Sequence, residues 1–306
     1  MGSSRIVTVF GTTGLQGAAV ARTLLKDGTF IPRAITRSPE SATALKLMAE
    51  GIEVVKADPR DKASLVGAMR GSEAVELKIL QITTPIFPLS AEGEGPNEVD
   101  QGKNRVDAAK EADIKFFIFT YDLSLPDIKK LSGGKYQKVV VEEYLRSSGL
   151  DNVCRHLCGF LENYWTLGWL KKATTGFDLN VPHLATDKAA FIWVERDILA
   201  VVLALLKNYS DPSKNICGKT YSIVNENISF GELADLTENV LGAKVTLTTA
   251  PPMGIEALDE MVGCAQPFYF LYRTEPVQLQ HQALAELNGI FPATSVPDFV
   301  NLGVKN

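Results

Sequence analysis

The first apolar run of the chain and the loop after it constrain the fold most strongly. The run IVTVF at 6–10 is rich in β-branched residues, as a buried strand is, and it leads directly into Gly11, Gly14 and Gly17. A helix-forming segment follows the loop. Glycine permits a tight turn at the first position, approach of a ligand to the backbone at the second, and close packing of helix on strand at the third. This order of strand, glycine loop and helix predicts a dinucleotide-binding domain.

The start of that helix is expected to hold the phosphates of the nucleotide. Its first N–H groups have no acceptor within the helix, and the helix dipole places partial positive charge at the same end. A glycine triplet alone is weak evidence, but here it lies between a strand and a helix and begins a βαβ series. The residues predicted to surround the pyrophosphate are Gly11, Thr12, Thr13, Gly14, Leu15, Gln16 and Gly17.

Strand-like and helix-like segments alternate through the first half of the chain. Strands are predicted at 5–10, 31–37, 52–57, 74–83 and 115–121, with helices at 14–27, 39–50, 61–70 and 97–113. A helix at 134–149, a strand at 152–158 and a return strand near 217–224 follow. Such alternation predicts an α/β fold of the Rossmann type, a doubly wound parallel sheet with helices on both faces.

The second half is less regular. Helices are expected at 195–208, 229–241 and 278–288, joined by loops that carry Pro and Gly. We therefore expect a nucleotide-binding Rossmann domain at 1–158, completed by the return strand. Residues 159–306 should form a smaller C-terminal α+β lobe that is interleaved with the sheet and binds the substrate or ligand.

The end of the second predicted strand indicates which dinucleotide is bound. NAD-binding domains usually carry Asp or Glu at this place to bind the ribose 2′-hydroxyl, whereas this chain reads Thr36-Arg37-Ser38. An arginine binds a 2′-phosphate through charge-assisted hydrogen bonds, and Ser38 offers another donor. The plain alternative for Arg37 is a solvated charge at a strand end, but its position favours NADP(H) over NAD(H).

Charge and cysteine content exclude several classes of function. The net charge is −5, from 31 basic and 36 acidic residues, and no basic cluster is present, which argues against nucleic acid or an anionic membrane as a partner. No apolar stretch approaches the length of a membrane span. The four cysteines and three histidines have no metal-ligand spacing, so no metal site is predicted. These features are typical of a reduced, cytoplasmic protein.

Taken together, these residues resemble the NmrA-like family, an atypical branch of the short-chain dehydrogenase/reductase superfamily. The glycine loop has that family's G-x-x-G-x-x-G form and is the sharpest match. The Thr36-Arg37 pair and Ala57-Asp58 also agree. Further matching segments, which extend the resemblance over nearly the whole chain, lie at 98–121, 136–150, 159–165, 185–202 and 221–241.

The resemblance implies two classes of function. Isoflavone-reductase-like and quinone-reductase-like members transfer hydride from NADPH to small unsaturated or carbonyl compounds. Other members resemble nitrogen-metabolite repressors and redox sensors, which bind the nucleotide and change protein partners without turnover. We expect a reductase of a small carbonyl, enone or quinone-like compound, with the NADPH/NADP⁺ sensor as the alternative. Clustered aromatic residues in the second half favour a flat, apolar ligand if they line its cleft.

The usual catalytic pair of the superfamily is absent. Its Tyr-x-x-x-Lys places both side chains on one helical face, but four residues before Lys138 stands Gly134. Tyr136 is two residues away and would point to roughly the opposite side of a helix. Three roles stay open for Lys138: general acid or ribose anchor, a non-catalytic contact to the nicotinamide end, or a surface ion pair with Glu142 worth only ~0.3 kcal/mol.

The resemblance also assigns roles near the ends of other predicted strands. Thr120 and Tyr121 are candidates for the hydroxyl that polarises a substrate carbonyl. Thr83 and Thr84 are expected beside the nicotinamide ribose, and Asp58 beside the adenine amine; each of these has a plain alternative as a strand-end residue.

Two residues of the segment GFLEN at 159–163 are assigned to the substrate pocket. Phe160 would form a wall of the pocket, and Asn163 would hydrogen-bond a ligand. Their plain alternatives are a core aromatic residue and a helix cap.

Overall fold

The computed structural model describes residues 5–78, 98–122, 137–157, 159–166, 168–223, 226–251 and 300. The chain divides into two compact units, which are described separately. The first comprises Met1–Ser124, Gly134–His156 and Val202–Thr220, and the second comprises Leu125–Gly133, Leu157–Val201 and Tyr221–Asn306.

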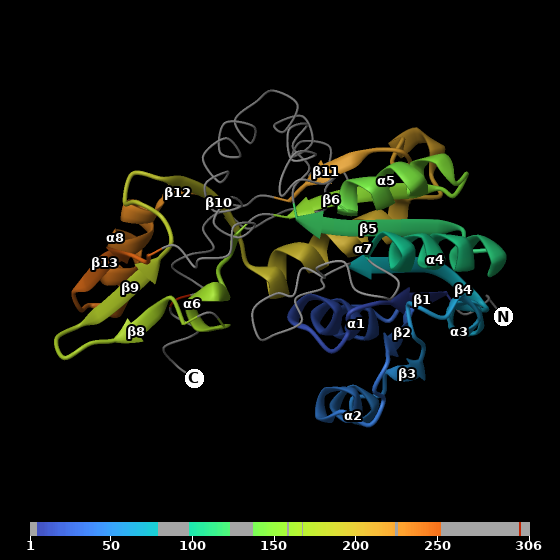
Figure 1. Ribbon diagram of the computed structural model, residues 1–306, viewed down its shortest axis with the longest axis horizontal. Helices are drawn as coiled ribbons and strands as arrows, with labels where there is room; N and C mark the ends of the chain where they lie inside the picture. Colours follow the sequence, from blue (N-terminus) through green and yellow to red (C-terminus); the bar gives the residue numbers. More distant parts are fainter. Residues whose placement is uncertain are drawn as a thin grey trace. The chain divides into compact units, whose positions relative to one another are not determined.

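A seven-stranded sheet, which belongs to the first unit except for Leu157, Tyr221 and Ser222, forms the centre of that unit (Figure 1). Its strands, in chain order, are β1 Ile6–Val9, β2 Ile31–Thr36, β3 Glu53–Lys56, β4 Ser72–Lys78, β5 Phe116–Asp122, β6 Asn152–Leu157 and β11 Thr220–Ser222. They lie in the order β11-β6-β5-β4-β1-β2-β3, and β1 to β5 pair in parallel. The order reverses between β1 and β4, so a ligand is expected at the carboxyl end of β1. The predicted Rossmann-type fold is confirmed.

Helices cover both faces of this sheet. They are α1 Leu15–Asp27, α2 Ala42–Ala49, α3 Lys62–Met69, α4 Glu98–Glu111, α5 Gln137–Ser147 and α7 Leu199–Asn208. Ile35 belongs to the apolar cluster formed with α3, α4 and α5, whereas its neighbour Ala34 packs with α1 and α2. Because successive strand residues point to opposite faces, the two helix groups lie on opposite sides of the sheet.

The predicted elements are present in the described ranges, with ends shifted by a few residues. The strand predicted at 74–83 begins earlier, at Ser72, and is described as far as Lys78. Residues 79–83, 134–136 and the helix predicted at 278–288 lie outside the described residues. Cys154 on β6 is buried in the sheet, and burial raises the pKa of its thiol, as expected of a small core residue.

The second unit contains two small three-stranded sheets. One has the order β12-β10-β7 and the other β13-β9-β8. The elements are β7 Gly159–Phe160, α6 Asn163–Thr166, β8 Leu170–Lys172, β9 Phe177–Val181, β10 Lys188–Ile192, β12 Glu226–Ser229, α8 Phe230–Leu241 and β13 Val245–Thr249. The helix predicted at 195–208 begins instead as a π-helix, η2 Val194–Ile198, before α7.

No helix among the described residues is long and apolar enough to cross a bilayer. In the same residues, no group of three or more His, Cys, Asp or Glu side chains is arranged to hold a metal ion.

Candidate functional site

The glycine loop joins β1 to α1 in a conformation that depends on its glycines. Gly11 has φ 68°, in the left-handed region that residues with a Cβ avoid. The N–H of Gly14 donates to the carbonyl of Gly11 at 3.0 Å, which closes the turn. A Cβ on Gly17 would lie 2.5 Å from the carbonyl carbon and oxygen of Gly11, so the helix can pack this closely only with glycine there.

Gly14 is not required by the protein's own packing in the same way. Its φ of −102° suits any residue, and a Cβ would meet only the Gly11 oxygen at 3.4 Å, an ordinary contact. Among the described residues, that oxygen is the one atom beyond the chain neighbours that lies within 4 Å of such a Cβ. That the backbone stays uncovered here agrees with the close approach of a phosphate expected from the sequence.

The start of α1 offers donors that the protein does not use. Gly14 is the N-cap and provides no side-chain bond. Within the described part of the chain, the N–H groups of Leu15, Gln16 and Gly17 find no acceptor. The side-chain Nε2 of Gln16 is also unpaired, although this residue is only 5% exposed. Unpaired N–H groups at a helix start attract anions, and a buried side-chain donor such as Gln16 Nε2 is normally paired, so these groups fit an anion such as a pyrophosphate.

The two threonines of the loop differ in their surroundings. Thr12 is buried, and its hydroxyl donates to the carbonyl of Ile35 on β2 at 3.1 Å. This bond ties the loop to the neighbouring strand. Thr13 is exposed, as is Leu15 at the start of α1. Thr12 therefore anchors the loop to β2, whereas Thr13 and Leu15 are exposed to solvent.

The end of β2 carries no acidic side chain. Arg37 and Ser38 follow the strand and are exposed, and Arg37 forms no ion pair with any described residue. The backbone N–H of Ser38 donates to the Thr36 hydroxyl at 3.1 Å, which fixes the turn. Arg37 is close enough to the end of β3 for its charge to act on Asp58.

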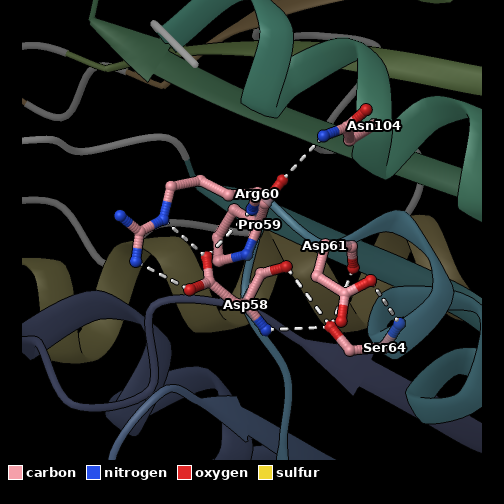
Figure 2. Close-up of polar contacts among 6 residues, drawn as sticks. All are labelled: Asp58, Pro59, Arg60, Asp61, Ser64 and Asn104. Carbon is pink, nitrogen blue, oxygen red and sulfur yellow. Dashed lines mark hydrogen bonds and ion pairs between the residues drawn. The ribbon is translucent and has the colours of Figure 1, made fainter. Parts of the chain in front are cut away.

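Figure 2 shows the turn between β3 and α3 held by a dense set of polar contacts. The Asp58 carboxylate accepts from the Arg60 guanidinium at 2.8 and 3.1 Å and from the Arg60 backbone N–H at 2.9 Å. These bonds lower the pKa of Asp58 to about 2. Asn104, on α4, donates to the Pro59 carbonyl at 3.1 Å. Asp58 lies where the sequence predicts the adenine side, but here its carboxylate holds Arg60.

A buried arginine that the sequence analysis did not select lies behind this turn. Arg105 on α4 is 8% exposed, and its guanidinium lies 5.5 Å from the ring centroid of Phe10, the residue before Gly11. Its Nε and Nη1 have no hydrogen-bond partner within the described residues. Burial lowers the pKa of Arg105 to about 10, so the group stays charged at neutral pH; Glu98, Arg37 and Asp58 also act on it.

The predicted hydroxyls at the end of β5 are both fully buried. Thr120 donates to Glu76 at 3.3 Å and accepts from Arg155, which is itself completely buried. The phenol of Tyr121 donates to Glu142 on α5, whose other oxygen accepts from Arg146 at 2.6 Å. Both hydroxyls are therefore engaged inside the first unit.

The remaining predicted residues are placed as follows. Lys138 is half-buried in the first turn of α5. Phe160 ends β7, where it pairs with Ile192 of β10, and Asn163 is the first residue of α6. Thr83 and Thr84 lie outside the described residues.

Comparison with solved structures identifies the fold. The chain superimposes on NmrA, a negative transcriptional regulator solved in complex with NADP, with a TM-score of 0.76 and 18% identity, over 98% of this chain and 95% of that one. For an NADPH-dependent quinone oxidoreductase from Escherichia coli, complexed with NADPH, the TM-score is 0.69 at 23% identity, over 98% and 100% of the two chains.

Sequence relatives agree with this match. An NmrA-like family domain-containing oxidoreductase, malD of Malbranchea aurantiaca, is 30% identical over 263 residues, 78% of this chain and 74% of the relative. Another, hkm9 of Aspergillus hancockii, is 34% identical over 170 residues, 53% of this chain; the match spans about half the length of that relative, 48%. The family model described as NmrA-like matches residues 3–273, and the chain therefore belongs to the NmrA-like family.

Proposed function

We propose that this protein is an NADPH-dependent reductase of a small, apolar carbonyl, enone or quinone-like compound. The observation that carries the proposal is the set of unused donors around the glycine loop, together with Arg37 in place of an acid at the end of β2. Free N–H groups at a helix start suit a pyrophosphate, and an arginine at this position suits a 2′-phosphate. When bound, NADPH supplies a hydride.

The chain's own residues would bind and orient the reactants. The glycine loop would hold the pyrophosphate, and Arg37 with Ser38 the 2′-phosphate. Among the three polar candidates, Lys138 is the one we assign to the nicotinamide end, as ribose anchor or proton donor. Thr120 and Tyr121 are buried with internal partners, so we expect them to maintain the local structure of β5 instead of touching the substrate.

The first test is the loss of NADPH absorbance with a panel of aldehydes, enones and quinones. Lys138→Ala should lower turnover roughly 100-fold or more, as expected for a positioned proton donor. The matched control is Lys110→Ala, which removes an exposed lysine from α4 and should leave turnover unchanged. Substrate-dependent turnover that survives Lys138→Ala would retain the reductase and remove Lys138 from the catalytic role.

The cofactor preference has its own test. Arg37→Glu should reduce the ratio of NADPH to NADH affinity roughly tenfold or more, because a charge-assisted bond is replaced by repulsion. Ser38→Ala, which removes one neutral donor, should change the ratio much less. An Arg37→Glu protein with the wild-type ratio in a titration of both nucleotides would refute the assignment of the 2′-phosphate site.

A nucleotide sensor is the second candidate. It is favoured by the engagement of Thr120 and Tyr121 inside the fold, which leaves few catalytic groups, and by the likeness to a regulator that binds NADP. A sensor needs different affinities for NADPH and NADP⁺, or for the conformations they stabilise. Tight NADPH binding without turnover, together with a partner protein whose binding depends on the NADPH/NADP⁺ ratio, would support it over the reductase.

A further inference from the structure

Arg105 occupies an unusual place for a charged residue. The buried stripe of α4 consists of Gly102, Arg105, Val106, Ala108 and Ala109, and the arginine is the only charged member. Its guanidinium lies over Phe10, next to the glycine loop. A cation over an aromatic ring gains ~0.5–2 kcal/mol but satisfies none of the N–H groups.

The unpaired N–H groups of Arg105 are costly in the ligand-free protein. A buried N–H donor without an acceptor is unfavourable, since the hydrogen bond to water that it loses is not replaced. Nε and Nη1 have no acceptor among the described residues. Because the described residues provide no hydrogen bond to Arg105, its guanidinium could turn away from Phe10 toward a ligand without breaking one. A ligand that offers acceptors would recover the lost interactions.

The charges around Arg105 indicate the kind of ligand. Arg37 and Asp58, from the ends of β2 and β3, and Glu98 of α4 act on it electrostatically. Asp58 is already paired with Arg60 (Figure 2), so it does not neutralise the other two arginines. The group thus contains three arginines, Arg37, Arg60 and Arg105, but only two carboxylates. It lies at the end of the sheet where the adenosine ribose is expected. This excess positive charge suits a phosphate.

We propose that Arg105 is a specificity-determining residue of the nucleotide site, which binds the 2′-phosphate of NADP(H) together with Arg37. This inference rests on the proposed nucleotide function. Asn104, the residue before Arg105, bonds Pro59 at the β3–α3 turn, so the same turn of α4 both anchors that loop and supplies the second arginine. Selectivity for NADP(H) would then be shared between β2 and α4.

The test uses two fragments of the cofactor, 2′,5′-ADP and 5′-AMP, which differ only in the 2′-phosphate. Their affinities are measured by calorimetry for wild type, Arg105→Met, Arg105→Lys and the charge control Lys110→Met. Arg105→Met should weaken the binding of 2′,5′-ADP roughly 10- to 100-fold and leave the affinity for 5′-AMP within about twofold of wild type. Arg105→Lys keeps the charge but loses the planar, forked guanidinium, so its affinity for 2′,5′-ADP should lie between those of wild type and Arg105→Met. The control should match wild type.

Thermal unfolding of the ligand-free variants gives an independent readout. Because Arg105→Met removes a buried, unpaired charge, its ligand-free Tm should equal or exceed that of wild type, even though the 2′-phosphate is bound more weakly. A purely structural arginine would give the reverse, a lower Tm and equal losses for both fragments, and would overturn the proposal. Unchanged binding of 2′,5′-ADP in both variants would also overturn it.

The same measurements distinguish a failure of the proposed nucleotide function from a failure of the role proposed for Arg105. If wild type binds neither fragment nor NADPH, the nucleotide site itself is wrong and the role of Arg105 falls with it. If wild type prefers 2′,5′-ADP and both Arg105 variants keep that preference, only the role of Arg105 is wrong.

Discussion

Two glycines of the loop have different roles, since Gly17 is required for the packing of the fold and Gly14 is expected to be required for nucleotide binding. Gly17 is enclosed by backbone: a Cβ there would lie 2.5 Å from the Gly11 carbonyl and 2.7 Å from the Phe10 oxygen, and backbone cannot move aside cheaply. Gly14 meets only an ordinary contact. The same substitution at the two positions should therefore affect different properties of the protein.

We predict that Gly17→Ala destabilises the first unit by roughly 1–3 kcal/mol, as an overpacked site does, whereas Gly14→Ala changes stability by no more than about 1 kcal/mol. Gly14→Ala should nevertheless weaken NADPH binding at least tenfold, because its Cβ occupies the approach to the backbone. Urea unfolding and a nucleotide titration of both variants measure this. Equal stabilities, or unimpaired binding by Gly14→Ala, would contradict the assignment.

At the scale of one element, the π-helix η2 begins against a buried acid. Glu162 precedes α6, is 7% exposed, and accepts from the Glu195 N–H of η2 at 3.3 Å. Burial raises its pKa to about 7 from an ordinary value of 4.5, against the opposing effect of nearby backbone N–H groups; the charge of Glu195 raises it further. Its Oε2 has no partner among the described residues.

This raised pKa makes the stability of the second unit depend on pH. Between pH 4.5 and 7 the folded protein holds a proton that the unfolded chain has released, so stability falls as the pH rises through this interval. Above pH 7 the full cost, at most about 3 kcal/mol, applies, and below pH 4.5 it is absent. Glu162→Gln, which stays neutral, should therefore be more stable than wild type at pH 8 and similar to it at pH 4.5.

The measurement is urea unfolding at both pH values, followed by tryptophan fluorescence. Trp165, Trp169 and Trp193 are the three tryptophans of the chain, and all belong to the second unit, so their signal reports that unit. The control is Asp178→Asn, an exposed acid on β9, which should show no such difference. A Glu162→Gln protein with the pH profile of wild type would rule out the buried acid as its cause.

How far the sequence predicts the elements depends on their length. The helices of the first unit and its longer strands, such as β2, β4 and β5, are long enough to show a period, and they are predicted to within a few residues. β7 has two residues and β8 three, too few for any alternation to be recognised. The π-helix has no pattern of its own in WVERDI, which therefore looks like the first turn of α7.

The features of the candidate site also differ in how far the sequence can predict them. The turn at Gly11 and the close packing at Gly17 follow from the spacing of the glycines, and both are confirmed. Arg105 has a signal that was available, since it lies three residues after Gly102 and four before Ala109 on one helical face. No pattern in the sequence indicates the pairing of Asp58 with Arg60, because this pairing depends on the shape of the turn after β3.

On the scale of the whole molecule, the central sheet contains a buried ion pair that joins three strands. Glu76 of β4 and Arg155 of β6 meet at 2.5 Å, with Thr120 of β5 between them, and the exposed fractions of the two charged side chains are 3% and 0%. Nε and Nη1 of Arg155 are unpaired within the described residues. Such a pair is costly to break but need not stabilise the fold, because both charges lose their hydration.

We therefore expect a strong dependence of each charge on the other. Arg155→Met or Glu76→Leu alone should destabilise the first unit by about 3–5 kcal/mol, because each removes one charge of a buried ion pair and keeps the other, whereas the double variant should recover most of that loss. All tryptophans lie in the second unit, so far-UV circular dichroism and amide hydrogen exchange of the sheet are the proper probes. Additive losses in the double variant would mean that shape and packing, and not the charge pair, determine the stability of this region. Recovery would show that the sheet tolerates an apolar centre, and the pair would then have to be explained by something other than stability.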